Sequence, residues 1–204
     1  MKDFWNLRYQ EEGYAYGIDP NTFFKDSLEK LNLSGRILLP AEGEGRNAVY
    51  AAKKGLEVHA FDLSEAGKSK AERLAKQEGV TINYEVGELE QLELSHKTYN
   101  AAALIFAHFP PPILQTYHQK IATLIQPNGI LLLEGFSKDH LEIRQANPQV
   151  GGPRSLEMLF SKDQIREDFV AFDPLVLEEV EVELKEGKYH NGIGKVVRFI
   201  GRKK

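Results

Sequence analysis

The apolar residues of this chain gather into short runs that alternate with more polar segments. Five of the apolar runs have the length of a strand, and continuous runs of this kind are typical of strands buried on both faces of a parallel sheet. These runs are 36–42, 56–63, 81–86, 100–109 and 130–136. The polar segments between and after them predict helices over 22–32, 45–54, 64–78, 113–125 and 161–169.

The end of the chain has a different pattern. Residues 176–187 alternate Val and Leu with Glu and Lys, which is the period of a strand with one wetter face. Residues 195–202 form a second apolar strand after a turn at 188–194, so the two strands predict an antiparallel hairpin. Strands that alternate with helices and end in such a hairpin predict an α/β fold, a doubly wound sheet whose ligand lies at the carboxyl ends of the strands.

Two segments lie outside this alternation. Residues 3–10 predict a short helix on which Trp5, Arg8 and Tyr9 share one face. That face suits either a lid over the ligand or a helix packed on the domain, and both readings stay open. Residues 137–160 have no strong period, and we expect a long loop of the kind that often serves as a lid.

Composition narrows the classes of function. The net charge is −4 and there is no long basic run, which argues against binding of nucleic acid. The chain has no cysteine, so disulfides and thiolate metal sites are excluded. The six histidines lack metal-ligand spacing, and we expect no metal site. With no signal peptide or membrane-spanning run, we expect a cytoplasmic protein of one domain, 1–204, with a helical lid segment at 1–33 and a core at 34–204. Nothing indicates the oligomeric state.

The turn after the first strand is rich in glycine. Gly43 to Ala48 fits G-x-G-x-x-A, and Asp62 follows 19 residues after Gly43, which is the spacing of a dinucleotide-binding turn. Glu42 and Glu44 flank the glycine, however, and each would repel a pyrophosphate by something on the order of a kcal/mol. A ligand that is positive near the turn would be attracted. S-adenosylmethionine (SAM) has a sulfonium and an ammonium but no phosphate, and Asp62 suits its ribose hydroxyls.

The sequence also resembles a known family. The segments "ILLPAEGEGRNA", "AFDLS", "EVGELEQL" and "LIQPNGILLLEGF" are similar to those of class I SAM-dependent methyltransferases, from about Arg36 to the end of the chain. "FWNLRY", "YGIDPN" and "HFPP" resemble the small-molecule branch that includes tellurite-resistance and thiopurine methyltransferases. The resemblance implies a Rossmann-like, seven-stranded, mostly parallel sheet with an antiparallel C-terminal hairpin edge. It implies SAM as cofactor, S-adenosyl-L-homocysteine as product, and a small-molecule acceptor such as a thiol, a chalcogen oxyanion or an amine.

The family turn D-x-G-x-G-x-G is incomplete here, because Leu39 and Ala41 replace its aspartate and first glycine. Glu42 or Glu44 is then the candidate partner of the SAM ammonium, and Glu88 that of the adenine amine. The residues expected to bind the cofactor are Ala41, Glu42, Gly43, Glu44, Gly45, Asn47, Asp62, Leu63, Gly87, Glu88, Leu89, Phe106 and Ala107.

The acceptor is expected between the N-terminal segment, the end of the fourth strand and the 137–160 loop. The candidate residues are Trp5, Arg8, Tyr9, Tyr16, His108, Phe109 and Arg154. Arg8 and Arg154 are the cations that would meet an anionic acceptor. An ionised acceptor needs no base, whereas a neutral amine or hydroxyl would need one, for which His108 is the candidate. No catalytic residue is assigned.

Two other functions are compatible with the fold. A nicotinamide-dependent oxidoreductase would use the same kind of sheet, but the acidic turn and the lack of room for a catalytic domain speak against it. A non-catalytic protein that binds SAM or a nucleotide would keep the same pocket, and the sequence leaves this alternative open.

Overall fold

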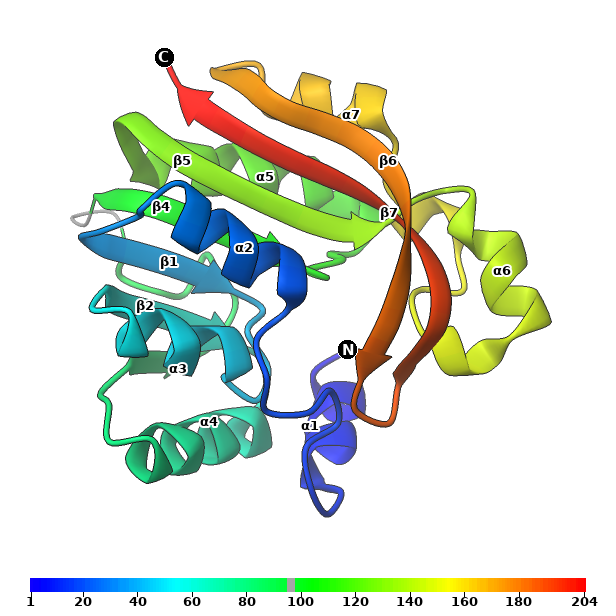
Figure 1. Cartoon of the computed structure of the whole chain (residues 1–204), viewed down its shortest axis with the longest axis horizontal. Helices are drawn as coiled ribbons and strands as arrows, with labels where there is room; N and C mark the ends of the chain where they lie inside the picture. Colours follow the sequence, from blue (N-terminus) through cyan, green and yellow to red (C-terminus); the bar gives the residue numbers. More distant parts are fainter. Residues whose placement is uncertain (95–97) are drawn as a thin grey trace.

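A computed structural model describes residues 1–94 and 98–204. Within these ranges a single sheet holds seven strands in the order β3-β2-β1-β4-β5-β7-β6 (Figure 1). The strands are β1 Arg36–Pro40, β2 Glu57–Asp62, β3 Asn83–Val86, β4 Tyr99–Ile105, β5 Ile125–Phe136, β6 Phe172–Glu186 and β7 His190–Lys203. The first five strands pair in parallel, whereas β7 pairs antiparallel with both β5 and β6. The predicted fold class is therefore confirmed.

The helices lie close to their predicted positions, except α6, which was not predicted. They are α1 Lys2–Gln10, α2 Thr22–Lys30, α3 Arg46–Lys53, α4 Glu65–Gln77, α5 Pro111–Leu124, α6 His140–Ala146 and α7 Lys162–Asp168. Ser64 and Ser161 cap α4 and α7, because their hydroxyls accept hydrogen bonds from the backbone N–H groups of Gly67 and Gln164. These caps set where the two helices begin.

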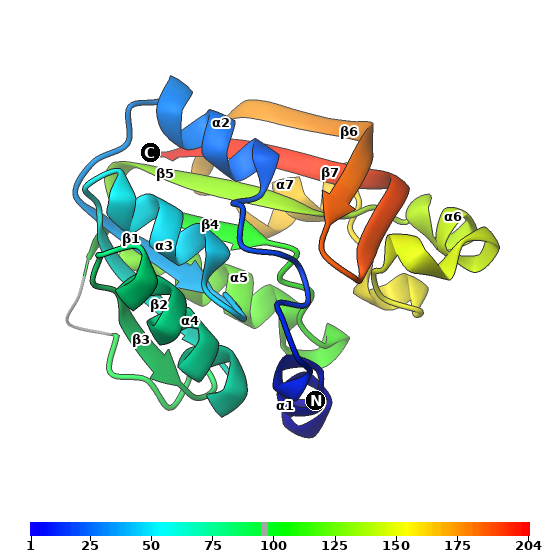
Figure 2. The same ribbon diagram turned by 60° about the horizontal axis from the view of Figure 1, so that its bottom comes forward.

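The sheet is covered on both faces (Figure 2). On β1, Ile37 and Leu39 pack with residues of α2, α3 and α4, while Leu38 points to the opposite face and packs with residues of α5 and α7. Alternate residues of a strand point to opposite faces, so a continuous apolar run is what a strand between two helical layers needs. The strand order reverses between β1 and β4, which is where ligands bind in sheets of this kind.

Three predicted segments differ from the structure. Residues 137–160 are not one long loop: they hold α6 and two short 3-10 helices, η1 Pro148–Val150 and η2 Leu156–Met158. The hairpin is longer than predicted, and its turn covers only residues 187–189. The segment 1–33 is not a uniform lid, because Phe23, Phe24 and Leu28 of α2 are buried in the core. None of the helices in the described residues has the length and hydropathy that crossing a membrane requires.

Candidate active site

Two adjoining cavities lie at the carboxyl ends of β1 and β4. We call them the wide cavity, of about 800 Å³, and the narrow cavity, of about 120 Å³. Trp5, Ala41, Phe106 and His108 line both, so the two cavities are separated by no more than these side chains. An elongated ligand can therefore occupy the narrow cavity and reach into the wide one.

The narrow cavity collects the predicted residues from three strand ends. Its walls include Asp62, Leu63, Gly87, Glu88, Leu89, Ala107 and Phe109, as well as Met1 and Trp5 of the N-terminal segment. The parallel register of β2 and β3 pairs Asp62 with Val86, which brings the residues after both strands to the same edge. The mixture of a buried carboxylate and apolar walls suits a nucleoside with hydroxyl groups.

The turn after β1 is shaped by its own packing. Ala41, Gly43 and Gly45 have positive φ angles of 53°, 65° and 87°. A Cβ at Gly43 would lie 2.6 Å from the Tyr9 hydroxyl, and one at Gly45 would lie 2.5 Å from Cβ of Ala71. The two glycines thus admit α1 and α4 against the turn. Ala41 is the turn residue that reaches both cavities.

The two glutamates of the turn differ in direction. Glu42 lines the wide cavity, and its Oε1 accepts a hydrogen bond of 2.7 Å from the N–H of Ala48 at the start of α3. Burial raises the pKa of Glu42 to about 7, although backbone N–H groups and Arg46 oppose this shift. The Glu42 carboxylate is thus available to a cation in the cavity.

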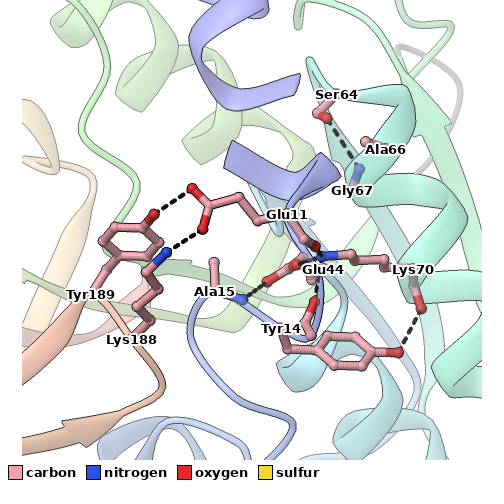
Figure 3. Close-up of polar contacts among 12 residues, drawn as sticks. Glu11, Tyr14, Ala15, Glu44, Ser64, Ala66, Gly67, Lys70, Lys188 and Tyr189 are labelled. Atoms are coloured by element: carbon pink, nitrogen blue, oxygen red, sulfur yellow. Dashed lines mark hydrogen bonds and ion pairs between the residues drawn. The ribbon is translucent and has the colours of Figure 1, made fainter. Parts of the chain in front are cut away.

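The Glu44 carboxylate forms its ion pair and its hydrogen bond with other groups of the protein (Figure 3). Its Oε1 pairs with Lys70 of α4 at 2.7 Å, and its Oε2 accepts a 2.6 Å hydrogen bond from the N–H of Ala15. Glu44 is 5% exposed. Both carboxylates of the turn were expected beside the ligand, whereas only Glu42 lines a cavity and Glu44 attaches the N-terminal segment.

Asp62 connects the turn to the narrow cavity. Its Oδ2 accepts from the N–H of Gly43 at 3.1 Å, and its Oδ1 accepts from the N–H of Ser64 at 3.0 Å. Burial raises the pKa of Asp62 to about 6. Since each carboxylate oxygen has two lone pairs, both keep capacity for a ligand hydroxyl. Asp62 therefore stabilises the turn and also forms part of the cavity wall.

His108 does not suit the role of a base. Its Nδ1 lies 2.7 Å from the carbonyl oxygen of Met158, and its Nε2 accepts a 3.0 Å hydrogen bond from the N–H of Phe136. Nδ1 must therefore carry the proton, and the lone pair of Nε2 is already used. Burial lowers the pKa of His108 to about 3. His108 is a neutral residue that joins β4, β5 and η2, and the sequence-based hypothesis of a base at this position is wrong.

The N-terminal segment is attached on two sides (Figure 3). On one side Lys70 donates to the carbonyl oxygens of Glu11 and Gly13. On the other, the Glu11 carboxylate accepts from Lys188 and Tyr189 at the hairpin turn, at 2.5 Å each. The segment thus joins α4 to the β6–β7 hairpin and closes one side of both cavities.

The wide cavity is lined by five cationic side chains. They are Arg8, Arg46, Arg144, Arg154 and Lys188. Of the predicted acceptor residues, Trp5, Arg8, Tyr16, His108 and Arg154 line this cavity, whereas Phe109 lines the narrow one and Tyr9 is buried against Gly43. Sequence reasoning missed Arg46, Arg144, Lys188, Tyr189 and His190. Only Arg46 had a signal, because it lies inside the glycine turn.

Comparison with known proteins adds to this geometry. Residues 37–129 match the family model described as a methyltransferase domain. No curated protein sequence matches the chain.

Several solved structures share the fold at low sequence identity. One comes from work on the conversion of a disulfide bond into a thioacetal group during echinomycin biosynthesis: it is 18% identical, covers 100% of this chain and 92% of its own, and has a TM-score of 0.77. TehB from Haemophilus influenzae is 16% identical, and the match covers 100% of this chain and 67% of TehB with a TM-score of 0.71. The 1,6-didemethyltoxoflavin-N1-methyltransferase of Burkholderia thailandensis, with its substrate and S-adenosylhomocysteine bound, is 18% identical, with coverage of 89% and 76% and a TM-score of 0.63.

The matched domain contains the glycine turn, Asp62, the 86–89 loop and the residues after β4, and it includes every residue of the narrow cavity except Met1 and Trp5. The residues present fit SAM as cofactor, because an acidic residue stands at the expected ribose position and a second one, Glu42, lies further along the same space. The expectation of a SAM-dependent enzyme is confirmed. Residues 37–129 of this chain thus match a methyltransferase domain, and the solved structures that share its fold include SAM-dependent methyltransferases.

Proposed function

We propose that the enzyme methylates a small anionic molecule held in the wide cavity. The observation that carries the proposal is the charge of the cavity wall, where five cations stand beside one carboxylate, that of Glu42. Glu186 pairs with Arg46, and Glu11 pairs with Lys188. Arg8, Arg144 and Arg154 have no carboxylate partner among the described residues, so three guanidinium groups stay available to an anion.

Arg8 is far from Arg144 and Arg154 in the sequence, yet all three arginines line the same cavity. Burial lowers the pKa of Arg144, and the like charges of Arg154 and Arg8 lower it further. Arg8 is also oriented, because it donates to the Tyr16 hydroxyl at 3.0 Å and lies 4.0 Å over the Tyr189 ring. Mutual repulsion of this kind is relieved when an anion binds between the cations, and a guanidinium offers paired donors to an oxyanion.

The cofactor has a natural direction in this arrangement. Its adenosine would lie in the narrow cavity, with the ribose at Asp62 and the adenine beside Gly87, Glu88 and Leu89. Its charged end would point along Ala41 toward Glu42. The methyl group would then stand where the two cavities meet, and the enzyme would act mainly by aligning the acceptor with it and excluding water.

A solved structure with a similar fold supports a small-molecule methyl acceptor. The toxoflavin methyltransferase holds a small molecule together with S-adenosylhomocysteine. A cavity of about 800 Å³ lies in the range that small-molecule sites occupy.

Binding and turnover test the proposal together. Calorimetric titration should show binding of SAM and S-adenosylhomocysteine but not of NADH. Release of S-adenosylhomocysteine should then be measured with selenite, tellurite, thiols and amines, and with 2-mercaptobenzoate and thiophenol, two aromatic thiols of which only the first carries a carboxylate. We expect the carboxylate-bearing thiol to be methylated with the lower KM. Equal or better use of thiophenol would contradict an anionic acceptor, and tight NADH binding without a response to SAM would contradict the cofactor.

A further inference from the structure

His190 is the first residue of β7 and lines the wide cavity, although the sequence did not indicate it as a site residue. Its ring centroid lies 4.6 Å from that of Phe106, which lines both cavities, and 4.5 Å from that of Tyr16. The imidazole is therefore one aromatic ring away from the junction at which the methyl group would stand.

The two ring nitrogens of His190 have different surroundings. Nδ1 lies 2.9 Å from Oε2 of Glu186. Because an ionised carboxylate can only accept, Nδ1 carries the proton and Nε2 keeps its lone pair. Within residues 1–94 and 98–204, Nε2 has no hydrogen-bond partner. His108, by contrast, uses both nitrogens on the main chain.

Gly151 keeps the space around Nε2 open. A Cβ at this position would lie 3.2 Å from Nε2 and 2.6 Å from Cδ2 of His190. Gly151 also lines the wide cavity and has a φ of 79°, which L side chains rarely adopt. The backbone at 151 thus leaves the lone pair of Nε2 on the cavity side.

Glu186 is held in place by a buried polar network. Arg46 pairs with its Oε2 at 3.0 Å, and Asn21 donates to its Oε1 at 3.1 Å. Asn21 also donates to Glu134, which pairs with Arg198. Burial raises the pKa of Glu186, but its bonds to His190 and Arg46 more than offset this and lower the pKa to about 2. The carboxylate is thus ionised and fixes the His190 tautomer.

Charged groups from several elements face His190. They are Glu186 of β6, Arg46 of α3 and Arg8 of α1, with His140 of α6 and His108 near enough to interact. Burial lowers the pKa of His190, and Arg46 and Arg8 add to this, while Glu186 opposes it. The net shift is downward, so the ring is neutral near pH 7 and can take up a proton.

We infer that His190, oriented by Glu186, removes a proton from the methyl acceptor, and that the acceptor therefore combines an anionic group with a neutral hydroxyl or amine. The inference deepens the proposed function and rests on it. As Nε2 takes the proton of the X–H group, the electron pair of X forms the bond to the methyl carbon. The carbon–sulfur bond breaks, its electron pair stays on sulfur, and the positive charge passes to the imidazolium, which faces Glu186. Water then takes up the proton.

The kinetic test compares two kinds of acceptor in the intact enzyme. The acceptors whose reacting group is a neutral hydroxyl or amine are 3,4-dihydroxybenzoate and anthranilate. The acceptors that need no base are selenite and 2-mercaptobenzoate. We expect His190→Gln to lower kcat for the first pair by at least about 100-fold, the lower range for a general base, and that for the second by less than about threefold. At saturating SAM, the fall of the wild-type kcat at low pH should disappear in the variant. His118→Gln is the matched control, because His118 also pairs with a carboxylate, that of Asp168, but lies buried in the core.

Three results would overturn the inference. One is an unchanged rate with 3,4-dihydroxybenzoate and anthranilate. The second is an equal loss with both kinds of acceptor, which indicates a structural role. The third comes from nitrogen NMR of histidine-labelled enzyme, which does not depend on turnover: we expect a protonated Nδ1 and an unprotonated Nε2 for His190 at pH 7, and the reverse would refute the tautomer. SAM titration of the variant should give an unchanged affinity. A wild-type enzyme that prefers thiophenol refutes the anionic acceptor but leaves the NMR result to decide on His190.

Discussion

The two cavities are built in different ways. The narrow cavity takes its walls mainly from the ends of neighbouring parallel strands, and its predicted residues follow those strands directly in the sequence. The wide cavity takes its charged groups from α1, α3, α6, the segment after η1 and the hairpin turn. The cofactor end thus follows from the topology of the sheet, whereas the acceptor end depends on segments added around it. Changes at the first should alter SAM binding, and changes at the second should alter acceptor choice.

The largest expected effect concerns α1, which belongs to both ends. Tyr9 is 5% exposed and packs against the glycine turn, whereas Trp5 is half-buried and lines both cavities. We expect Tyr9→Ala to lower the free energy of unfolding by about 3 kcal/mol, as for other buried aromatic rings. Trp5→Ala should cost less stability but weaken SAM binding and raise the acceptor KM. Chemical denaturation and titration of both variants measure this. A small loss for Tyr9→Ala would favour a lid over a packed helix.

Asp62→Ala tests the cofactor end. We expect SAM affinity to fall by about 1.5–3 kcal/mol, the range for hydrogen bonds to a charged group. Since Asp62 also accepts from Gly43 and Ser64, Asp62→Asn is the matched control that keeps one acceptor oxygen. Calorimetry gives the affinities, and a melting curve shows whether the turn survives. An unchanged affinity in the alanine variant would mean that the ribose lies elsewhere.

Arg144→Gln tests the acceptor end. We expect the KM of an anionic acceptor to rise about 10- to 100-fold, with SAM affinity unchanged. Arg166→Gln on α7 is the control, because Arg166 is also an arginine of a short helix but lies exposed and pairs with Asp163. Steady-state kinetics with 2-mercaptobenzoate measure the effect. Equal KM values for the two variants would remove Arg144 from the acceptor site.

The smallest expected effect is on pH dependence. Glu42 and Asp62, with pKa values of about 7 and about 6, must be ionised to bind the cation and the ribose, so SAM affinity should fall about 20-fold from pH 8 to pH 6. The folded-state pKa of each is raised, so without ligand these groups favour the folded state at low pH, and this contribution is lost as pH rises through 6 and 7. Melting curves should show a SAM-induced shift that grows with pH. Glu42→Gln should flatten it.

Much of the fold was predictable, because buried parallel strands leave long apolar runs and helices leave caps such as Ser64. Helix α6 and the two 3-10 helices could not be predicted, since they are short. Their position depends on contacts such as that of His140 with Phe136, whose ring centroids are 4.1 Å apart. Short helices of this kind have little stability of their own.

The site divides in the same way. Asp62 and the 87–89 loop were found because their positions follow strand ends. The directions in which Glu42 and Glu44 point could not be predicted, because the partners of Glu44 are Lys70 and Ala15, which are far away along the chain. His190 stood in a segment that predicted only a turn, and its partner Glu186 is set by the register of the hairpin.

The contact of Glu11 with Lys188 has a consequence for how the enzyme is made. It joins groups 177 positions apart, while the residues around the narrow cavity all lie between Met1 and Tyr117. During synthesis every wall of the cofactor cavity has left the ribosome before residues 188–190, which complete the acceptor cavity. Contacts this distant along the chain also close the longest loop and so form at the greatest entropic cost. The residues that form the narrow cavity are thus all synthesised before those that complete the wide one.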